Sequence, residues 1–357
     1  MTEWTIYRFK PKPGAGFHFG LRGLEQEDSA AHCPSDTLFA ALVATLGDLE
    51  GTASVDRFTA PFEGGTPPFL LTSAFPIAGS LPLLPRPFTQ INLTPVPGQR
   101  KLLKRLSYVS PAIFRRILDG ELMDDYAGEK GAFLQGGTVW IAVGETERLP
   151  EKWRALDKAR LREQKVWDST PVDRVAVDRA SSASSIYRIG RTTYAPGCGL
   201  WAGVQWPQGI DAVAQAQLET LLTYLGDQGL GGERSVGYGQ FELKTTGLDL
   251  GLPAVDGGRA LTLSRYLPRR EELPDALQGE AAYRLAPVAG WLGAPGHAAR
   301  RRRQVRFLVE GAVFETVGAG PWGRLADVRP AGWDGFPIWR YGYACSVGVP
   351  ARGVSDA

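Results

Sequence analysis

Gly229-Leu230-Gly231-Gly232-Glu233-Arg234-Ser235-Val236-Gly237-Tyr238-Gly239-Gln240-Phe241 is the most informative stretch of this chain, because five glycines surround one arginine, one serine and one tyrosine. The amphipathic segment 213–225 precedes it, and Phe241-Glu242-Leu243 alternates between apolar and polar residues after it. This order predicts an α-helix, then a glycine-rich loop, then a β-strand.

The residues of this loop are suited to binding an anion. Glycines let a backbone adopt positive φ and let an external group approach the main chain closely, and bare N–H groups in such a loop form an anion-binding concavity. Arg234 and Ser235 add donors suited to phosphate, and Tyr238 adds a ring on which a base can stack. The alternative is a tight turn that needs glycine for its shape alone. Five glycines in eleven residues exceed that need, so we favour phosphate binding.

The order of elements excludes the common nucleotide-binding loops. A P-loop needs Gly-Lys-Ser/Thr at the start of a helix, and the dinucleotide-binding fingerprint needs strand, loop and helix in that order. Here the loop follows the predicted helix and precedes the predicted strand. This order favours a polymer that lies across a sheet over a mononucleotide.

Arginine dominates the basic residues of a nearly neutral chain. The net charge is +2, and the 40 basic residues are 31 Arg and 9 Lys. Arginine is the residue suited to bidentate phosphate contacts and to stacking on bases. The clusters are Arg100-Lys101 with Lys104-Arg105, Arg115-Arg116, and Arg300-Arg301-Arg302-Arg303 with Arg306. Each alone is typical of a solvated surface, but with the glycine loop they indicate a basic track on a nearly neutral body.

Bulk features argue against a membrane protein and against a metal site. No run of 18 apolar residues occurs, so we expect no transmembrane helix. The N-terminus alternates like a first strand and does not resemble a signal peptide. The three cysteines, Cys33, Cys198 and Cys345, lie far apart without a CxxC pair, which supports neither a zinc site nor a disulfide framework. We therefore expect a cytoplasmic protein without a metal or other cofactor.

Two units are predicted, residues 1–247 and 256–357, on either side of a break rich in Gly, Asp and Pro. The first unit has the order strand, helix, scattered strands, helix, loop and strand. The second unit has a shorter pattern that resembles it. Together these patterns predict an α+β protein with two ferredoxin-like (RRM-type) units, the first enlarged by insertions.

Two local features of the first unit are predicted as well. An apolar helix covers 38–49, and Ser35 or Asp36 can cap its free N–H groups. Alternating residues over 171–189 predict a long β-hairpin that projects from the body, with a serine-rich tip at 180–185.

Five segments in order resemble a known group. The glycine loop is similar to that of the RAMP proteins of CRISPR systems, and four further segments resemble the fourth subunit of the Csm complex, the type III-A CRISPR effector. These segments are His18-Phe19-Gly20 followed by Ser35-Asp36-Thr37-Leu38-Phe39-Ala40-Ala41-Leu42, Ser73-Ala74-Phe75-Pro76 with Leu84-Pro85-Arg86-Pro87, Val175-Ala176-Val177-Asp178-Arg179, and Ile338-Trp339-Arg340-Tyr341-Gly342. The resemblance runs nearly from end to end.

The resemblance implies a role without catalysis. In that family the subunit caps the foot of the complex and holds the 5′ repeat-derived handle of the CRISPR RNA (crRNA). It also anchors the large subunit that carries the polymerase-like Palm domains and abuts the first backbone RAMP subunit. The family's Val-Asp-Arg segment is often followed by Thr-Gly, where this chain has Ala180-Ser181-Ser182, so the shape of the hairpin tip stays open.

Single-stranded RNA is held by stacked bases, edge hydrogen bonds and 2′-OH contacts. For the phosphates we expect the backbone N–H groups of Gly231, Gly232 and Gly237, supported by the side chains of Arg234 and Ser235. A rigid cradle of this kind suits a handle of short, fixed sequence.

The remaining predicted RNA-binding residues surround this cradle. On the hairpin, Arg174 and Arg179 would clamp sugar and phosphate, while His18 and Phe19 would stack on or cap the RNA. Tyr238 would offer its ring to a base.

Three alternatives to the handle-binding role stay open. The first is a crRNA-processing endoribonuclease on the same fold, which would need a histidine near the 2′-OH. Of His18, His32 and His297, only His18 in Phe-His-Phe-Gly is a serious candidate, and no metal-binding or nucleophile motif supports it. The second is an assembly subunit whose glycine loop only packs, and the third is the equivalent subunit of a type III-B complex. We expect no enzyme.

Overall fold

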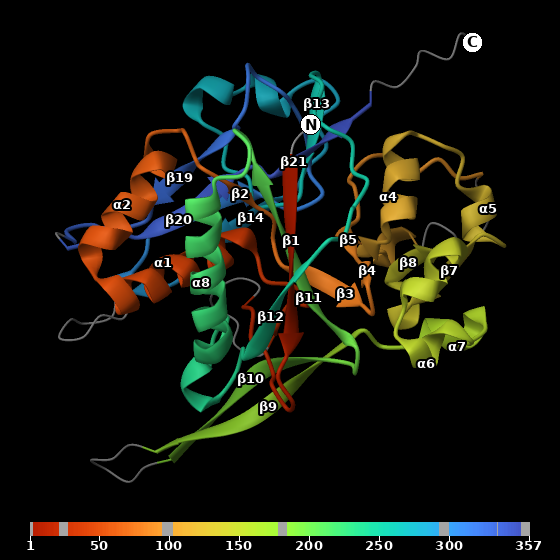
Figure 1. Ribbon diagram of the computed structural model, residues 1–357, viewed down its shortest axis with the longest axis horizontal. Coiled ribbons are helices and arrows are strands. Elements are labelled where there is room, and N and C mark those ends of the chain that lie inside the picture. The colour runs from red at the N-terminus through yellow and green to blue at the C-terminus, as the bar shows by residue number, and fades with distance from the viewer. Residues whose placement is uncertain are drawn as a thin grey trace.

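The computed structural model describes residues 3–20, 28–94, 103–177, 184–292, 300–333 and 335–350. A six-stranded antiparallel sheet lies at its centre (Figure 1), in the order β12-β1-β11-β3-β4, with β2 also paired to β11. Its strands are β1 (Glu3–Pro11), β2 (Leu70–Leu71), β3 (Phe75–Ala78), β4 (Leu81–Pro82), β11 (Cys198–Trp206) and β12 (Phe241–Thr246). Three helices belong to the same part of the chain, α1 (Ser35–Glu50), α2 (Thr52–Glu63) and α8 (Ala212–Gln228).

The sheet is apolar on both faces because its middle strands are covered on both sides. In β1, Ile6 belongs to one apolar cluster, whereas its neighbours Tyr7 and Phe9 belong to the other. Successive side chains of a strand point to opposite faces, so each face has its own core. Helices α1 and α8 cover the Tyr7 face, where Leu38 and Leu222 are buried. Helix α8 ends before the glycine loop and β12 begins after it, so the predicted order of helix, loop and strand is confirmed.

An insertion between β4 and β9 forms a second sheet at the right of Figure 1, in the order β5-β6-β8-β7. Its elements are β5 (Leu84–Pro85), β6 (Tyr108–Val109), α4 (Pro111–Leu118), α5 (Asp124–Ala127), β7 (Gly131–Leu134), η1 (Gln135–Gly137), β8 (Val139–Ala142), η2 (Val143–Arg148), α6 (Glu151–Arg154) and α7 (Lys158–Glu163). The insertions predicted for the first unit thus include a folded layer with its own strands.

The predicted hairpin is present as the antiparallel pair β9 (Trp167–Val177) and β10 (Ser184–Tyr194). It extends away from the central sheet at the lower edge of Figure 1. Its tip, including Arg179, lies outside the described residues.

The chain after Gly257 is built from short strands. They are β13 (Arg259–Thr262), β14 (Leu285–Val288), β15 (Trp291–Leu292), β16 (Arg300–Arg301), β17 (Val305–Leu308), β18 (Val313–Glu315), β19 (Gly323–Asp327), β20 (Trp339–Tyr343) and β21 (Ser346–Val349), with the 3-10 turns η4 (Arg270–Glu272) and η5 (Asp275–Leu277). They form the sheets β18-β13-β21, β14-β17, β15-β16 and β19-β20.

This C-terminal part differs from the prediction of a second ferredoxin-like unit, which would carry two helices. The described residues from 259 to 350 contain no α-helix. Between β13 and β14 the backbone forms only the two 3-10 turns η4 and η5.

The two predicted units share their apolar cores. Leu261 and Val347 of the C-terminal part lie in the same cluster as Ile6, and Tyr341 lies in the cluster of the α1 helix. The Tyr341 ring is 5.1 Å from that of Phe39, measured between centroids. The two largest apolar clusters therefore contain residues from both sides of the division at residues 247–256. The domain boundary itself stays a prediction.

The N-terminus of α1 is held by the C-terminal part of the chain. The residue before the helix is Pro34, so the prediction that Ser35 or Asp36 caps it is wrong. The Ser35 hydroxyl instead accepts the backbone N–H of Arg265 at 2.9 Å, and Asp36 accepts a hydrogen bond from the Arg340 guanidinium at 2.9 Å. These partners are far apart in the sequence, which local patterns cannot show.

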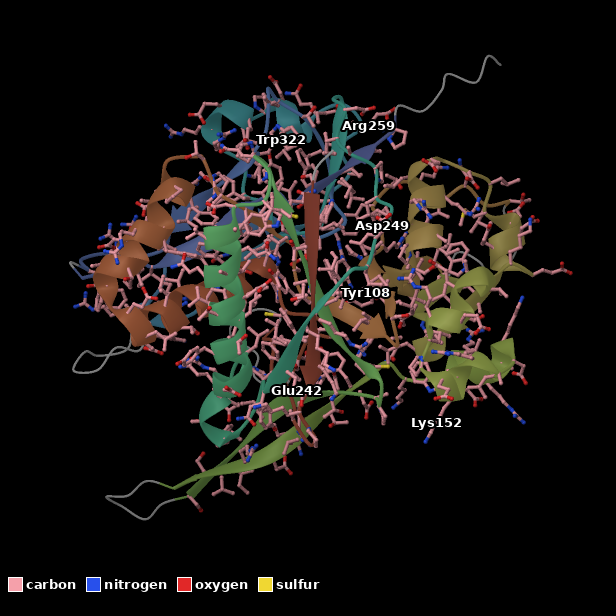
Figure 2. All side chains as sticks on the ribbon, in the orientation of Figure 1. Tyr108, Lys152, Glu242, Asp249, Arg259 and Trp322 are labelled. Carbon is pink, nitrogen blue, oxygen red and sulfur yellow. The ribbon has the colours of Figure 1, made fainter. Side chains whose placement is uncertain are left out.

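A buried carboxylate, Glu310, lies beside this contact. It accepts hydrogen bonds from the Ser73 hydroxyl at 2.6 Å and from Arg265 Nε at 3.3 Å, and His32 Nε2 lies 3.7 Å away. Burial alone would raise the pKa of Glu310, but the charge of Arg265 and the contacts of His32 and Ser73 bring that pKa well below its usual range. The other ring nitrogen of His32 is hydrogen-bonded to the hydroxyl of Tyr108 at 2.8 Å, near the middle of the molecule in Figure 2.

We predict that Glu310→Gln lowers the free energy of unfolding by about 3–5 kcal/mol, because it leaves the buried Arg265 without its counter-charge. Denaturant titration at neutral pH measures this loss. Because the folded state lowers the pKa of Glu310, the stabilisation is complete above the pKa of an unfolded glutamate and falls as the pH drops below it. Glu310→Gln should remove that part of the acid dependence.

The matched control is Glu242→Gln. Glu242 lies on β12 (Figure 2) and forms an exposed ion pair with Lys10 of β1, so this variant should leave the unfolding midpoint nearly unchanged. Equal stability of both variants would contradict the central role of Glu310.

Candidate nucleic-acid interface

The glycine loop, defined as residues 229–240, is closed by its own backbone. The N–H of Leu230 donates to the carbonyl of Gly239 at 3.0 Å, and the N–H of Gly239 donates to the carbonyl of Gly16 at 2.7 Å. Gly239 has φ +83°, and a Cβ there would lie 2.3 Å from backbone atoms of Leu230. Glycine is required at this position both for conformation and for close approach of two backbones.

The loop rests on the segment that follows β1. The N–H of Gly232 donates to the carbonyl of His18 at 2.9 Å. Gly231 has φ +99°, and a Cβ there would lie 2.5 Å from the same carbonyl and 3.1 Å from the Phe19 ring. Sequence reasoning placed His18 and Phe19 with the loop, and the structure brings them together.

The base of the hairpin joins the same place. His18 Nδ1–H donates to the carbonyl of Gly190 on β10 at 2.8 Å. Phe17 and Thr192 form an antiparallel bridge, and the Arg191 guanidinium donates to the carbonyl of Gly14 at 2.7 Å. The hairpin, the segment after β1 and the glycine loop therefore meet at one junction.

Tyr238 links the loop to the hairpin arginines. The guanidinium carbons of Arg174 and Arg191 lie 5.4 and 5.7 Å from the centre of its ring, which is the range of cation–π contacts. The ring is only 5% exposed. The prediction that Tyr238 stacks on a base is wrong in this conformation, because both arginines and the protein interior cover the ring. Its role here is to orient Arg174 and Arg191.

Phe19 does not offer a ring to RNA either. It is 2% exposed and belongs to the apolar core, where its ring lies 5.6 Å from that of Phe17. The prediction of stacking by Phe19 is therefore wrong, because an aromatic residue beside a glycine loop fits core packing as well as RNA binding. His18 is half-buried, with one nitrogen held by Gly190.

The free donors of the loop are not all at its glycines. The N–H of Gly232 is taken by His18, and that of Gly237 donates to the carbonyl of Arg234 at 3.0 Å, so neither fits the predicted role of phosphate donor in this conformation. Gly231 keeps an N–H without a partner in the described part of the chain.

The strongest group of donors lies at Glu233, Arg234 and Ser235. Within the described residues, no protein acceptor faces their three successive N–H groups. Glu233 is in the left-handed conformation, with φ 58°, and Arg234 begins the 3-10 turn η3 (Arg234–Val236). Successive free N–H groups in such a turn form a concavity that attracts anions. The side chains of Arg234 and Ser235 are exposed beside them.

Sequence reasoning missed Glu233 and Arg191. A non-glycine residue with positive φ carries strain that often marks a functional turn, but no sequence pattern shows it. Arg191 could have been found, because the alternation of the hairpin places it on the same face as Arg174.

The described residues lack a cluster of metal-ligating side chains. They hold no group of three or more His, Cys, Asp and Glu side chains that could bind a metal ion.

None of the described helices has the length and apolar character needed to cross a bilayer.

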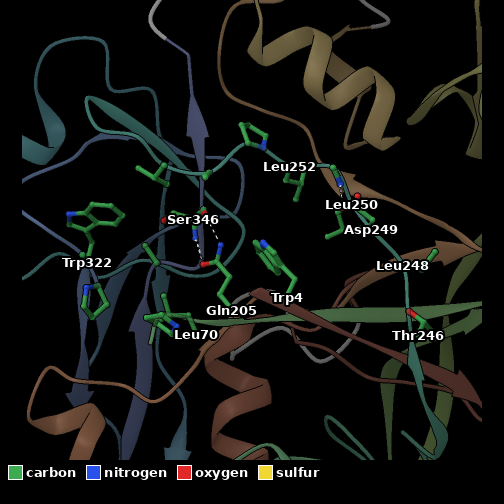
Figure 3. Close-up of a pocket in the computed structure, with 18 of the residues that line it drawn as sticks. Trp4, Leu70, Gln205, Thr246, Leu248, Asp249, Leu250, Leu252, Trp322 and Ser346 are labelled. Atoms are coloured by element: carbon green, nitrogen blue, oxygen red, sulfur yellow. Dashed lines mark hydrogen bonds between the residues drawn. The ribbon is translucent and has the colours of Figure 1, made fainter. Parts of the chain in front are cut away.

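A groove of about 740 Å³ lies between the start of β1 and the connection from β12 to β13 (Figure 3). Trp4 and Trp322 line it, with Gln205 bonded to the backbone of Ser346. Its one carboxylate, Asp249, accepts the N–H of Gly251, and no described lining residue is a His, Cys, Lys or Arg. Asp249 is therefore the one acid–base side chain among the described residues that line this groove.

Comparison with known proteins links the chain to one family. Residues 256–349 match the CRISPR Csm4 C-terminal domain. The "CRISPR system Cms protein Csm4" of Mycobacterium tuberculosis is 26% identical over 337 residues, which are 93% of this chain and 94% of that protein. The protein of the same description from Thermococcus onnurineus is 23% identical over 287 residues, 80% and 83% of the two chains.

Solved structures have the same fold. A chain in the crystal structure of the Csm3–Csm4 subcomplex of the type III-A interference complex aligns over 96% of this chain and 98% of its own, with TM-score 0.68 and 16% identity. A chain of the Csm1–Csm4 cassette in complex with pppApA aligns over 98% of both chains, with TM-score 0.56 and 18% identity. The resemblance to the fourth Csm subunit is confirmed.

We predict that Gly239→Ala destabilises the protein much more than Gly237→Ala. Both glycines have φ near +84°, but a Cβ at Gly237 meets nothing within 4 Å, whereas one at Gly239 meets the backbone of Leu230. The shared left-handed strain costs about 1–2 kcal/mol, and the clash at Gly239 should add about 1–3 kcal/mol. Unfolding by denaturant compares the two variants, and equal losses would contradict the closed geometry of the loop.

Proposed function

We propose, since this chain is similar to Csm4 proteins over nearly its whole length, that it is a non-catalytic RNA-binding subunit of a type III-A interference complex. It holds the 5′ repeat-derived handle of crRNA and anchors the large Palm-domain subunit. The first unit is a ferredoxin-like RAMP domain, because β1, α1, β2/β3, β11, α8 and β12 follow the order strand, helix, strand, strand, helix, strand. A cytoplasmic location is part of this proposal.

The observation that carries the proposal is the set of free donors at the tip of the glycine loop. Three successive N–H groups, at Glu233, Arg234 and Ser235, are without protein acceptors among the described residues, and two of these residues add exposed donor side chains. A phosphate can accept several hydrogen bonds at once, and charge-assisted bonds are about twice as strong as neutral ones. The loop is therefore suited to one phosphate of an RNA backbone.

The hairpin supplies the second side of this RNA site. Arg174 and Arg191 lie on the hairpin face that meets the glycine loop, and Tyr238 holds both side chains near the loop. The Nε atoms of Arg174 and Arg191 have no hydrogen-bond partner among the described residues. We expect the two guanidinium groups to contact the sugar-phosphate backbone next to the phosphate at Ser235.

The partners follow from the proteins with the same fold. The matched structures are complexes of Csm4 with Csm3 and of Csm4 with Csm1. By analogy, this chain assembles with a backbone RAMP subunit and with the large Palm-domain subunit. The equivalent position in a type III-B complex and a crRNA-processing endoribonuclease are the alternatives.

We predict that Arg234→Ala weakens the binding of handle-bearing RNA by about 1–3 kcal/mol, because it removes a charged donor from the phosphate site. Fluorescence anisotropy with labelled RNA measures the affinity. Arg160→Ala is the matched control, since Arg160 is also exposed but lies on α7 of the insertion. An unchanged affinity of folded Arg234→Ala would refute this assignment.

We also predict that the purified protein leaves labelled repeat RNA intact, with or without Mg²⁺. His18 is the one histidine at the proposed RNA site in the described residues, and its Nδ1 is engaged by Gly190. Gel analysis after long incubation tests this. Site-specific cleavage that disappears in His18→Ala would favour the endoribonuclease instead.

A further inference from the structure

A second basic region lies in the C-terminal part, away from the glycine loop. Residues 281–309 contain six arginines and no Lys, Asp or Glu. Four of these arginines are consecutive, at 300–303, and the first two form strand β16, paired with β15. So strong a bias of charge in one segment needs a physical explanation.

Two exposed aromatic rings lie among these arginines. Trp291 is 57% exposed and pairs with Arg301 across the β15–β16 ladder. Phe336 is 53% exposed, and its ring lies 5.6 Å from that of Trp333. Large aromatic rings are normally among the more buried residues of a protein, so two that are more than half exposed indicate a contact surface.

A hydrogen bond and a shared apolar cluster connect the strand pair that carries Trp291 to the loop that carries Phe336. The Arg300 guanidinium donates to the carbonyl of Gly332 at 3.0 Å, which ties β16 to the loop that carries Trp333 and Phe336. Leu292 and Trp333 belong to the same apolar cluster beneath. We call the exposed residues of this surface the C-terminal basic face: Trp291, Arg300, Arg301, Arg303 and Phe336.

The positive charge of this region is not compensated within the described residues. Asp327 is bound by Arg329 at 2.5 Å, and Asp36 is bound by Arg340. Arg302 lies behind the face with an Nε that has no partner there. Burial, and secondly the nearby charge of Arg340, lower the pKa of Arg302 to about 10.

We propose that the C-terminal basic face binds single-stranded nucleic acid as a second contact surface, with bases stacked on Trp291 and Phe336 and phosphates bound by Arg300, Arg301 and Arg303. Exposed rings next to arginines match single strands, whose bases offer π-faces and whose backbone carries regular negative charge. Aromatic rings and arginines also occur together at protein interfaces. The run of arginines without a neighbouring carboxylate in 281–309 favours the regularly charged backbone of a nucleic acid.

This surface is distinct from the handle site. The glycine loop lies between α8 and β12, near hairpin β9–β10, whereas the β19–β20 pair that leads to Phe336 lies beside α1 and α2 (Figure 1). We expect contact without sequence preference, because stacking accepts any base. The face would hold RNA that extends beyond the handle.

The test uses the full chain and a 12-nucleotide oligouridine that lacks the repeat sequence. The double variant Arg301→Glu/Arg303→Glu and the single variant Trp291→Ala should each weaken this binding by about tenfold. For the double variant the slope of log affinity against log salt should also become less steep by about 1.4. Arg160→Glu, on the insertion, is the matched control and should change neither quantity.

Comparison with handle RNA separates this proposal from the proposed function. Arg234→Ala should impair the preference for the handle over oligouridine, whereas Trp291→Ala should leave that preference in place. To guard against misfolded variants, 5-iodouridine RNA is also photocrosslinked to the unaltered protein, and crosslinks are expected at Trp291 or Phe336.

Three outcomes would overturn the proposal. They are oligouridine binding that is equal in all variants, crosslinks that avoid both rings, and loss of binding to the large subunit without any loss of RNA affinity. The last result would identify the face as a protein-docking surface.

Discussion

The buried carboxylate of Glu310 is the constraint on which the arrangement of the parts depends. It accepts hydrogen bonds from Ser73 of the central unit and from Arg265 of its own C-terminal part. His32 lies beside it and is hydrogen-bonded to Tyr108 of the insertion. A buried charge is tolerable only when its partners are held in place. The three parts of the chain must therefore assemble together. The start of α1 joins the same contact, because Ser35 accepts the N–H of Arg265 and Asp36 accepts a hydrogen bond from Arg340.

This constraint also explains why the C-terminal part need not be a complete ferredoxin-like unit. Part of it completes the clusters of the central sheet, through Leu261, Val347 and Tyr341. Its other buried residues form small clusters of their own, such as that of Tyr266, Leu308 and Phe314. Short strands are sufficient for both, because each contributes a few apolar side chains to a cluster.

Sequence reasoning succeeded where a local pattern determines the backbone. The helix, loop and strand around 229–241 and the hairpin β9–β10 both follow from periodicity and glycine placement. It did not predict which donors and rings are free where a residue distant in the sequence occupies them. Glycines indicated the loop, but the N–H of Gly232 is claimed by His18, and Tyr238 is covered by Arg174 and Arg191. In this loop Gly231 and Gly239 allow close packing of the backbone, and three of the free N–H donors belong to the non-glycine residues Glu233, Arg234 and Ser235.

Under the proposed function, a nearly neutral protein must select RNA through local groups. With a net charge of +2, the chain has little general attraction for polyanions, so affinity depends on local groups that lack internal counter-ions. Most carboxylates near the arginines are engaged, as Asp36 is with Arg340 and Asp327 with Arg329. The loop tip, the hairpin base and the C-terminal basic face are three places where arginines of the described chain lack an ion pair. Under the proposed function, a strand that follows these places would gain free energy at each of them. This would favour one path for the RNA over random adsorption.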